Sequence, residues 1–493
     1  MEFFKENRIM LSDSYKYSHF LQYPKNGINT YSYAEARSFK NYDKTLFFGL
    51  QMIWKKYFTN PITIEEVEEA NLYAEVHGIP FNKKAWVKII KEYSGFLPVT
   101  IKAVPEGLVI PNKMILFTIE LTNSDKDLIW LPSWLEDFLM KIWYTCTVAT
   151  RSYYVKEMLL ENAKMTSMDL NPNVDFQFHN FGDRAASSVE SAAFGGVAHL
   201  TCFKGTDNFN CLRYAHTFMN QDIKDIAFSI PASEHSTTTS WGKDGEFDMV
   251  DNNLEANKGN PLMAQVADSY DIYNFTDKIT SGKFKEKIES NDYPKFIERP
   301  DSGNPIDVMN GILNIYEKNN VEYNENKKGY KTFKKYGFIW GDGTNMVNMN
   351  DILTTLRLRM YEASNMSFGS GGWLMQQHDR DTLGFAIKCS SITLEKEVFA
   401  WNGEELGVKI FDREVFKDPI TDKGKTSKRG RVTTYFDRAT DTFEVGLEKG
   451  GSMGRSEVLE VVIENGKLIK EYTLTQVRAN VQKCLEGRIR DIF

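Results

Sequence analysis

Between residues 225 and 372, short apolar stretches end repeatedly in a polar, turn-forming cluster. The clusters contain, in order, His235, Asp271, Asp301, Asp342 and Gly371. Successive clusters lie about 30 to 40 residues apart, close to the length of a strand–helix–strand unit. Segments with apolar residues at helical spacing, such as 308–316 and 352–360, fill the gaps. This repetition predicts parallel strands joined by helices, in an irregular parallel α/β barrel.

The segment 296–305, with the sequence FIERPDSGNP, shows the pattern most clearly. Its first two residues are apolar, as at the end of a buried strand, and Ser-Gly-Asn-Pro at 302–305 is typical of a turn. Pro305 stands where the first turn of a helix accepts proline. Arg299 and Asp301 would then lie at the carboxyl end of the strand, where open sheets and barrels bind ligands. An R-x-D pair by itself is about as often a structural ion pair as part of a site.

Two glycine-rich turns are candidates for a phosphate-binding site, although a glycine-rich turn taken alone is more often only a turn. GSGG at 369–372 follows a short strand and precedes a helix-compatible segment, so its backbone N–H groups could bind an anion. GDG at 341–343 sets a carboxylate between two flexible residues, and Arg380 follows closely enough to close over the same phosphate. The basic stretch 423–431 lacks the glycine of a Walker loop, because Pro419 stands in its place. We interpret it as a mobile basic loop that could meet pyrophosphate, with a solvated surface loop as the default.

The chain is long enough for more than one hydrophobic core. It has 493 residues, 42% of them apolar and 13% aromatic, which corresponds to two or three domains. Residues 99–121 predict two or three strands, the apolar stripe at 130–143 predicts a packing helix, and strand-like alternation returns after the barrel. We therefore expect a barrel domain over residues 151–384 and an α+β domain built from both chain ends, residues 1–150 with 385–493.

The composition argues against several classes of protein. The net charge is −7 with acidic and basic residues mixed, which argues against a nucleic-acid or membrane surface. The five cysteines are scattered without C-x-x-C spacing, which argues against a disulfide framework or a zinc site. The sequence has neither an apolar signal core at the amino terminus nor a run of about eighteen apolar residues. We therefore expect a cytoplasmic protein.

Six blocks of sequence, in order over nearly the whole chain, resemble the nicotinamide phosphoribosyltransferase family. They are DSYK at 13–16, FKGTD at 203–207, PASEHS at 231–236, DSYDIY at 268–273, RPDSGNP at 299–305 and FGSGG at 368–372. The resemblance implies a type II phosphoribosyltransferase fold and a homodimer whose sites are shared between subunits. It also implies a pentosyltransferase of NAD salvage, which forms nicotinamide mononucleotide and pyrophosphate from nicotinamide and 5-phosphoribosyl-1-pyrophosphate. Mg²⁺ is implied as well, together with ATP, whose hydrolysis would phosphorylate the enzyme on histidine.

The resemblance assigns the nicotinamide base to a small group of residues. Phe181 and the partner subunit's Tyr15 would stack on the ring, and Asp13 belongs to the same block as Tyr15. Arg184 and Asp207 would hold the carboxamide. A carboxylate at position 207 accepts a hydrogen bond from an amide NH₂ group but repels another carboxylate, so nicotinamide should be preferred to nicotinate.

The sugar and the phosphates are assigned to charged residues and glycines. Asp301 and Arg299 would hold the ribose and phosphates, and Asp271 would lie near the metal and pyrophosphate. Residues expected around the ribose and its 5′-phosphate are Gly341, Asp342, Gly371, Gly372 and Arg380. Cations expected to face pyrophosphate or the ATP phosphates are Arg37, Lys388, Lys417 and Lys425. The resemblance gives no set of metal ligands.

His235 is expected to accept a phosphoryl group rather than to act as a general base. The pyridine nitrogen needs no deprotonation, so transfer requires Mg²⁺ on the leaving group, carboxylates near the sugar and a nucleophile held in line. An isolated histidine at a strand end is more often a hydrogen-bonded core residue. The surrounding E-H-S-T match favours the functional interpretation.

Three positions depart from familiar members of the family. Asp183 replaces an aromatic residue, Ala185 replaces glycine and Ala267 replaces serine. Because the residues expected to stack on the ring and to bind the amide are present, we expect activity to remain and base affinity to change.

Other functions stay open at the level of the sequence. A nicotinate phosphoribosyltransferase shares the fold and much of the chemistry, although Asp207 argues against it. A barrel enzyme of another class, such as a sugar-phosphate isomerase or an aldolase, would also use a glycine-rich phosphate site. A non-catalytic binding or signalling protein would bind ligand without forming product. Type I phosphoribosyltransferases are disfavoured because no Asp-Asp pair occurs, and Glu136-Asp137 falls within the apolar helical stripe.

Overall fold

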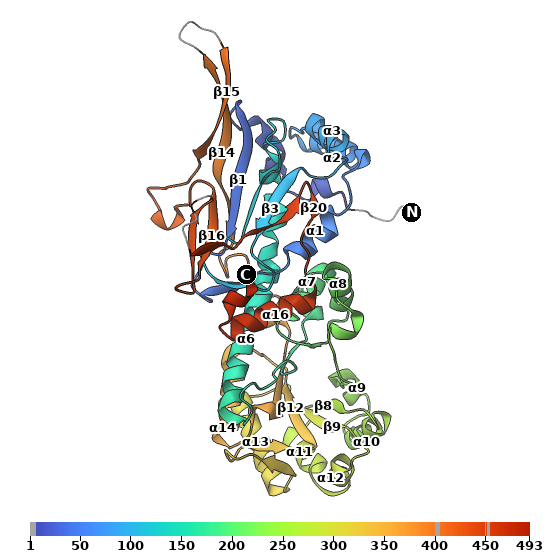
Figure 1. The fold of residues 1–493 in the computed structure, drawn as a ribbon. Coiled ribbons are helices and arrows are strands. Elements are labelled where there is room, and N and C mark those ends of the chain that lie inside the picture. Colours follow the sequence, from blue (N-terminus) through green and yellow to red (C-terminus); the bar gives the residue numbers. More distant parts are fainter. Residues whose placement is uncertain (1–5, 400–404, 449, 451–453) are drawn as a thin grey trace. The chain divides into compact units, whose positions relative to one another are not determined.

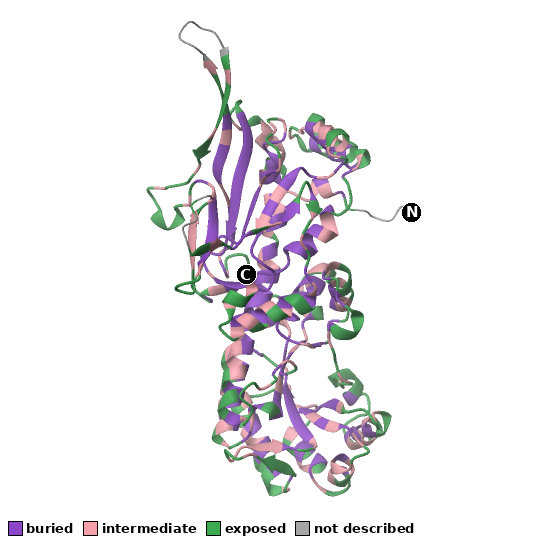
Figure 2. Ribbon diagram, in the orientation of Figure 1, coloured by how far each residue is buried: buried purple, intermediate pink, exposed green. Residues whose placement is uncertain are grey.

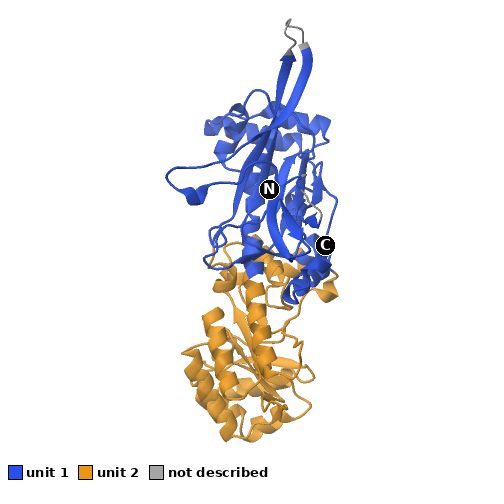
Figure 3. Cartoon of the chain, turned by 60° about the vertical axis from the view of Figure 1, so that its left-hand side comes forward, with its two compact units in different colours: residues 1–150, 215–221, 379–493 blue, residues 151–214, 222–378 orange. Residues whose placement is uncertain are grey.

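The computed structural model describes residues 6–399, 405–448, 450 and 454–493. The chain forms two compact units (Figure 3). Unit 1 comprises residues 1–150, 215–221 and 379–493, and unit 2 comprises residues 151–214 and 222–378. The short segments 215–221 and 379–384 therefore belong to the unit that contains both chain ends, whereas the sequence placed them with the barrel.

Unit 2 is built around six parallel strands (Figure 1). They are β6 (Phe178–Asn180), β7 (Gly205–Thr206), β8 (Leu262–Val266), β9 (Lys295–Arg299), β12 (Tyr336–Trp340) and β13 (Met366–Ser370). Their order in the sheet is β7-β6-β13-β12-β9-β8, and every neighbouring pair is parallel. Successive strands of this set lie side by side in the sheet, except that β7 and β8 are at opposite edges. The last strand, β13, pairs with the first, β6.

An irregular segment closes this gap and makes the sheet a barrel. Phe228 forms a parallel bridge with Gly205 of β7, and Ala232 forms one with Ala264 of β8. The segment 228–232 therefore touches both edge strands, with backbone hydrogen bonds of 2.8 Å from Phe228 N to Lys204 O and 2.9 Å from Ala264 N to Pro231 O. The predicted irregular parallel barrel is confirmed.

The helix after β9 begins where the sequence predicted it. Asn304 caps α13 (Pro305–Lys318): its side-chain oxygen accepts hydrogen bonds from Ile306 N and Asp307 N, and Pro305 occupies the first turn. Val308, Met309, Ile312, Leu313 and Tyr316 are buried along one face of this helix. The strand, the turn and the amphipathic helix together fix the position of Asp301 at the end of β9.

The other helices of unit 2 lie between or after the strands in sequence. They are α7 (Val189–His199), α9 (His235–Thr239), α10 (Glu246–Ala256), α11 (Ile272–Ile279), α12 (Gly282–Glu289), α14 (Met346–Leu358) and α15 (Gly372–Met375), and a hairpin of β10 (Tyr323–Glu325) and β11 (Lys331–Phe333) lies among them in sequence. Two helices, α6 (Ile142–Thr166) and α8 (Asn210–Phe218), have residues in both units. No helix within the described ranges combines the length and the apolar character needed to cross a membrane.

Unit 1 contains a seven-stranded antiparallel sheet that both chain ends build. Its strands are β1 (Gly27–Glu35), β3 (Val99–Ala103), β5 (Phe117–Leu121), β14 (Ala386–Phe399), β15 (Glu405–Glu414), β19 (Glu460–Glu464) and β20 (Lys467–Leu468), in the order β15-β14-β1-β5-β3-β19-β20. Pairing of β1 with β14 and of β3 with β19 joins the amino-terminal to the carboxyl-terminal segments. Figure 2 shows that β1, in the middle of the sheet, is buried along its whole length.

Helices and two smaller sheets complete unit 1. The helices are α1 (Leu50–Phe58), α2 (Ile64–His77), α3 (Lys83–Glu92), α4 (Leu131–Trp134), α5 (Glu136–Met140) and α16 (Leu474–Leu485), and the 3₁₀ helix η2 spans Ser14–Leu21. The smaller sheets are β17 (Thr442–Leu447), β16 (Val432–Asp437) and β18 (Arg455–Glu457), and β2 (Lys44–Leu46) with β4 (Val109–Pro111).

The apolar stripe at 130–143 packs a core, as predicted, but it does so from short helices rather than one. Trp134 in α4 lies 4.9 Å from Trp86 between ring centroids, and Phe138 in α5 lies 4.9 Å from Phe58. All four rings are buried. Such edge-to-face contacts between aromatic rings stabilise a core beyond the area that they bury.

Candidate active site

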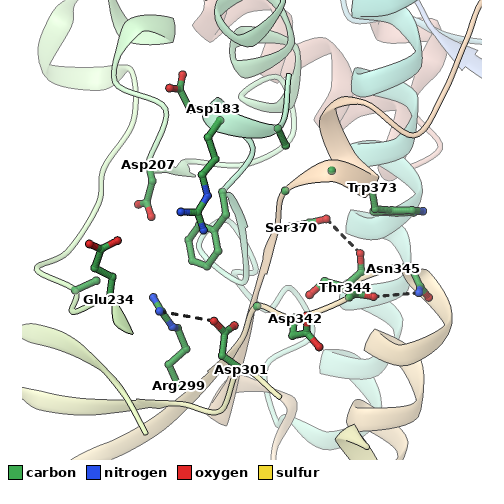
Figure 4. A pocket seen from close by; sticks show the side chains of 18 of the residues that line it. Asp183, Asp207, Glu234, Arg299, Asp301, Asp342, Thr344, Asn345, Ser370 and Trp373 are labelled. Atoms are coloured by element: carbon green, nitrogen blue, oxygen red, sulfur yellow. Dashed lines mark hydrogen bonds and ion pairs between the residues drawn. The ribbon is translucent and has the colours of Figure 1, made fainter. Parts of the chain in front are cut away.

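A cavity of about 910 Å³ lies in unit 2 at the carboxyl ends of the parallel strands (Figure 4). Residues predicted from the sequence that line it are Phe181, Arg184, Asp207, Arg299, Asp301, Gly341, Asp342, Gly371 and Gly372. Lining residues without a predicted role are Asp183, Ala185, Ala232, Ser233, Glu234, Gly343, Thr344, Asn345, Ser370, Trp373 and Gln377. Five separate strand ends and the closing segment 228–232 thus converge on one space.

The ring of Phe181 is held against the backbone of β13. Phe181 N donates a hydrogen bond of 2.9 Å to Ser370 O. A Cβ atom at Gly369 would stand 1.9 Å from Cε2 of the Phe181 ring, which no side chain permits. Gly182, next in the chain, is equally constrained, because its Cβ would stand 2.3 Å from Met375 Cγ. These glycines leave Phe181 a flat, fixed position at the wall of the cavity, suited to stacking on a planar ligand.

Asp207 enters the cavity directly after β7. Its backbone N donates to Asn180 O at 3.0 Å, and its Oδ1 accepts a hydrogen bond of 2.8 Å from Ser229 Oγ. Figure 4 shows its carboxylate on the same side of the open space as Glu234, above Arg299. Ser229 belongs to the closing segment, so the same irregular strand that completes the barrel also orients Asp207.

A second group of charged residues lies at the ends of β8 and β9. Arg299 Nη2 stands 3.8 Å from Asp301 Oδ2, and His235 Nδ1 stands 4.0 Å from the same oxygen. Burial raises the pKa of the Asp301 carboxyl above its usual value; Arg299 and His235 lower it, whereas Asp268 and Asp342 raise it further. A carboxyl group in this setting keeps its proton to higher pH than an exposed aspartate does.

The partner of His235 is a residue that the sequence analysis did not single out. His235 Nε2 lies 2.9 Å from Asp268 Oδ1, and the Asp268 side chain is only 6% exposed against 45% for His235. Because an ionised carboxylate accepts hydrogen bonds and cannot donate them, this contact places a proton on Nε2, and in the neutral form of the ring the lone pair is then on Nδ1. The DSYDIY block contains Asp268 as well as Asp271, so the block was the available signal.

Asp271 has a local role in the structure. Its Oδ1 accepts hydrogen bonds of 3.0 Å from Tyr273 N and 3.1 Å from Asn274 N, which caps the amino terminus of α11. It is not among the residues that line the cavity. A role of Asp271 beside the metal and pyrophosphate therefore stays a prediction.

The remaining predicted site residues belong to unit 1, where each has its own surroundings. They are Asp13, Tyr15, Arg37, Arg380, Lys388, Lys417 and Lys425. Tyr15 is 57% exposed on η2, Arg380 pairs with Asp381 at 3.1 Å, and Lys425 pairs with Asp422 at 3.4 Å. The cations are exposed except Lys388, which is half-buried, and the roles of all seven residues also stay predictions.

The cavity carries more negative than positive side chains. Its lining has the carboxylates Asp183, Asp207, Glu234, Asp301 and Asp342, and the two guanidinium groups of Arg184 and Arg299. Oxygen ligands of this kind suit Mg²⁺, which proteins usually hold through one or two carboxylates together with phosphate oxygens of a substrate. Among the described residues no group of three or more His, Cys, Asp or Glu could hold a metal ion by itself. The residues therefore fit a Mg²⁺ ion that arrives with phosphates.

Comparison with known proteins identifies relatives over nearly the full chain. Residues 176–447 match the nicotinate phosphoribosyltransferase (NAPRTase) family, and residues 7–101 match the amino-terminal domain of nicotinamide phosphoribosyltransferase. A nicotinamide phosphoribosyltransferase from Xanthomonas campestris pv. campestris is 40% identical, covering 96% of this chain and 98% of that one. One from Acinetobacter baylyi is 28% identical, covering 98% and 99%.

Solved structures share the fold at low sequence identity. The nicotinate-nucleotide pyrophosphorylase of Pyrococcus furiosus aligns with a TM-score of 0.61 at 13% identity, over 99% of this chain and 98% of that one. Human nicotinic acid phosphoribosyltransferase aligns with a TM-score of 0.50 at 12% identity, over 97% and 94%. At these identities the likeness concerns the arrangement of strands and helices alone.

Proposed function

This chain belongs to the nicotinate phosphoribosyltransferase family and, within it, to the nicotinamide phosphoribosyltransferases, and we propose that it transfers the 5-phosphoribosyl group of 5-phosphoribosyl-1-pyrophosphate to nicotinamide. The predicted type II phosphoribosyltransferase fold and the assignment to the pentosyltransferases hold. The products would be nicotinamide mononucleotide and pyrophosphate, in the salvage of NAD.

The observation that carries this proposal is one cavity that contains both a place for a planar ring and a place for a sugar. Phe181 lies flat on β13 at one wall, while Asp207 and Arg184 line the same space. Arg299 ends β9 and Asp301 follows it, on the side where Figure 4 also shows Asp342. A base stacked on Phe181 would thus face a ribose held by Asp301.

Asp207 favours nicotinamide over nicotinate as the base. Its Oδ1 already accepts from Ser229, and a carboxylate has further lone pairs for the NH₂ group of a carboxamide. A nicotinate carboxylate at the same place would meet a like charge in a cavity where carboxylates already outnumber cations. Nicotinate phosphoribosyl transfer is the second candidate, because the family and the solved neighbours include enzymes named for nicotinate.

The chain's own residues would act on charge and position rather than on protons. Loss of pyrophosphate leaves positive charge on the ribose, which the carboxylate of Asp301 would stabilise, while Arg299 would bind phosphate oxygens. The pyridine nitrogen attacks with its own lone pair, so no general base is required. When bound with the substrate, Mg²⁺ would neutralise charge on the leaving pyrophosphate.

We also propose that ATP stimulates the reaction by phosphorylating His235. Asp268 accepts from Nε2–H and leaves the lone pair of Nδ1 for a phosphoryl group, on a ring that is 45% exposed. A phosphohistidine beside the pyrophosphate site would add charge and order the substrate complex. The γ-phosphoryl group of ATP would pass to Nδ1 with release of ADP, and later hydrolysis of the phosphohistidine to phosphate would complete the hydrolysis of ATP.

The proposal includes a homodimer with shared sites in the cytoplasm. The lining of the unit 2 cavity offers only two guanidinium groups to a substrate with several phosphate charges. Further cations would come from Arg37, Arg380, Lys388, Lys417 and Lys425, and a second ring from the partner subunit's Tyr15. Asp13, in the block of Tyr15, is proposed to support substrate binding.

One incubation tests the proposed function. The enzyme is supplied with Mg²⁺, 5-phosphoribosyl-1-pyrophosphate and either nicotinamide or nicotinate, with and without ATP, and the nucleotide formed is identified by chromatography. Nicotinamide mononucleotide as the main product, with a higher rate when ATP is present, is the expected result. Nicotinate mononucleotide as the main product would establish the second candidate, and no nucleotide from either base would reject both.

A further inference from the structure

The hairpin of β14 and β15 extends beyond the rest of its sheet (Figure 1). The pairing of β1 with β14 ends at Gly27, which lies opposite Leu394. The pairing of β14 with β15 continues to Phe399, which lies opposite Glu405. Residues 395–399 therefore have a neighbouring strand on one side only. Within the described part of the chain, β15 pairs with β14 alone and is the outer strand of the sheet. A two-stranded ribbon of this kind has little stability in water.

One face of β15 carries a row of exposed apolar side chains. Leu406, Val408 and Ile410 are 65%, 56% and 61% exposed, and alternate residues of a strand share a face. Phe411, on the opposite face, packs against the buried core cluster that contains Leu394. The apolar row therefore points away from the core of its own unit. An exposed outer strand with such a row is a template for pairing with another strand.

We propose that β15 pairs antiparallel with β15 of a second copy of this chain, about a two-fold axis at Val408. In this register Leu406 lies opposite Ile410 of the second copy, and Val408 lies opposite its own counterpart. The two-fold axis repeats the first pair on the other side, so three apolar cross-strand pairs form along the row. On the other face Gly407 lies opposite Lys409 of the second copy, so the Lys409 side chains of the two copies do not face each other.

The neighbouring registers are less favourable. An axis at Lys409 would place two copies of Lys409 opposite each other, and because β14 already sets Lys396 opposite Lys409, four lysines would stand in one line across the sheet. Like charges directly opposite each other destabilise a sheet. An axis at Ile410 would place Val408 opposite Asp412. The sequence of β15 is therefore self-complementary at Val408.

The strand beside the apolar row suits this arrangement. Glu397 lies opposite Val408 and Glu395 lies opposite Ile410 within the hairpin, and both glutamates are exposed. After pairing, the two acidic rows lie on the outer strands of a four-stranded ribbon, and the apolar pairs lie between them. An apolar centre with a polar rim is the usual composition of an interface between subunits. This contact uses none of the residues placed in the active site, so it goes beyond the shared-site dimer proposed above.

The first test is the mass of the assembled full-length chain, measured by size-exclusion chromatography with light scattering. Val408→Lys places two like charges at the two-fold axis and should halve the assembled mass. Glu397→Lys is the matched control, because it adds the same side chain to the same ribbon one strand away from the paired edge, and it should leave the mass unchanged. Mixing Val408→Lys with Val408→Glu should restore the full mass, which a misfolded variant would not do.

The second test is a covalent link at the same axis. Val408→Cys places two thiols opposite each other, so oxidation by added oxidised glutathione should join two chains through a disulfide, with reduction of the glutathione. Glu397→Cys should give no such product. Of the chain's own cysteines, Cys389 is partly exposed and the others are buried. An unchanged mass for Val408→Lys, or no cross-linking of Val408→Cys above the control, overturns the proposal.

Discussion

Replacing Asp207 by asparagine should narrow the preference for nicotinamide over nicotinate. Asparagine has nearly the shape of aspartate and can still accept a hydrogen bond from Ser229 through its carbonyl oxygen. The substitution removes the negative charge and one acceptor oxygen and adds an NH₂ donor. It therefore weakens the bond to a carboxamide NH₂ group and, at the same time, relieves the repulsion of a carboxylate.

The size of the effect follows from the position of Asp207. The carboxylate lines the cavity and is oriented by a hydrogen bond of 2.8 Å, so little energy is lost in arranging it for the ligand. A hydrogen bond to a charged group contributes roughly 1 to 3 kcal/mol. The ratio of kcat/KM for nicotinamide to that for nicotinate should therefore fall by about 5- to 150-fold in Asp207→Asn.

The assay is the rate of nucleotide formation from each base at fixed 5-phosphoribosyl-1-pyrophosphate, with Asp183→Asn as the matched control. Asp183 also lines the cavity and is exposed, and the same chemical change there should alter the ratio by much less. If the ratio is unchanged in Asp207→Asn, or changes equally in both variants, Asp207 does not recognise the carboxamide.

Three further predictions test the sugar site, the dimer and the histidine. Tyr15→Ala and Asp301→Ala should each be nearly inactive alone and regain part of the activity when mixed as heterodimers, whereas full activity of a monomer by light scattering would reject shared sites. His235→Ala should lose ATP hydrolysis and ATP stimulation but keep basal transfer, so loss of basal transfer in a variant with a native thermal melt would contradict its role as phosphoryl acceptor. The pKa of Asp301 is raised, so kcat/KM should fall as the pH drops through that raised pKa and the carboxylate becomes protonated. Arg299 lowers this pKa, so Arg299→Gln should move the fall in kcat/KM to higher pH. If the acid limb of the pH profile does not move, Asp301 does not control the acid limb.

The strand ends of the barrel could be predicted because the chain marks them locally. At the end of β9, an apolar strand, a turn and the cap at Asn304 all lie within ten residues, so Asp301 could be placed from the sequence. The glycines at 369 and 371 predicted a turn. The sequence could not show that a side chain at position 369 would clash with Phe181, because these two residues lie far apart in the chain. Local signals thus located Asp301 and the glycine-rich turns, whereas Phe181, Arg184 and Asp207 were assigned from the resemblance to a family.

What the sequence could not give depends on contacts between distant segments. The segment 228–232 forms only single bridges, and nothing in its composition shows that it touches both edges of the sheet. Asp268 and Asp271 stand three residues apart after β8, and only the fold decides that one meets His235 while the other caps α11. Residues 215–221 belong to unit 1, where Gln51 Nε2 donates to Phe218 O and Thr475 N donates to Gln221 Oε1, and hydrophobic periodicity does not reveal such contacts.

The charge of the cavity links the choice of base to the chemistry of transfer. Five carboxylates and two guanidinium groups line it, although the sugar substrate is itself strongly anionic. This excess opposes phosphate binding, and the proposed Mg²⁺ and cations from outside the lining would offset that opposition. The same excess stabilises positive charge on the ribose as pyrophosphate leaves, and on the pyridine nitrogen once it has bonded to carbon. The excess of carboxylates also disfavours the binding of an anionic base before the transfer. A neutral base that becomes cationic in the product therefore fits this cavity better than nicotinate does, for reasons that extend beyond the single contact with Asp207.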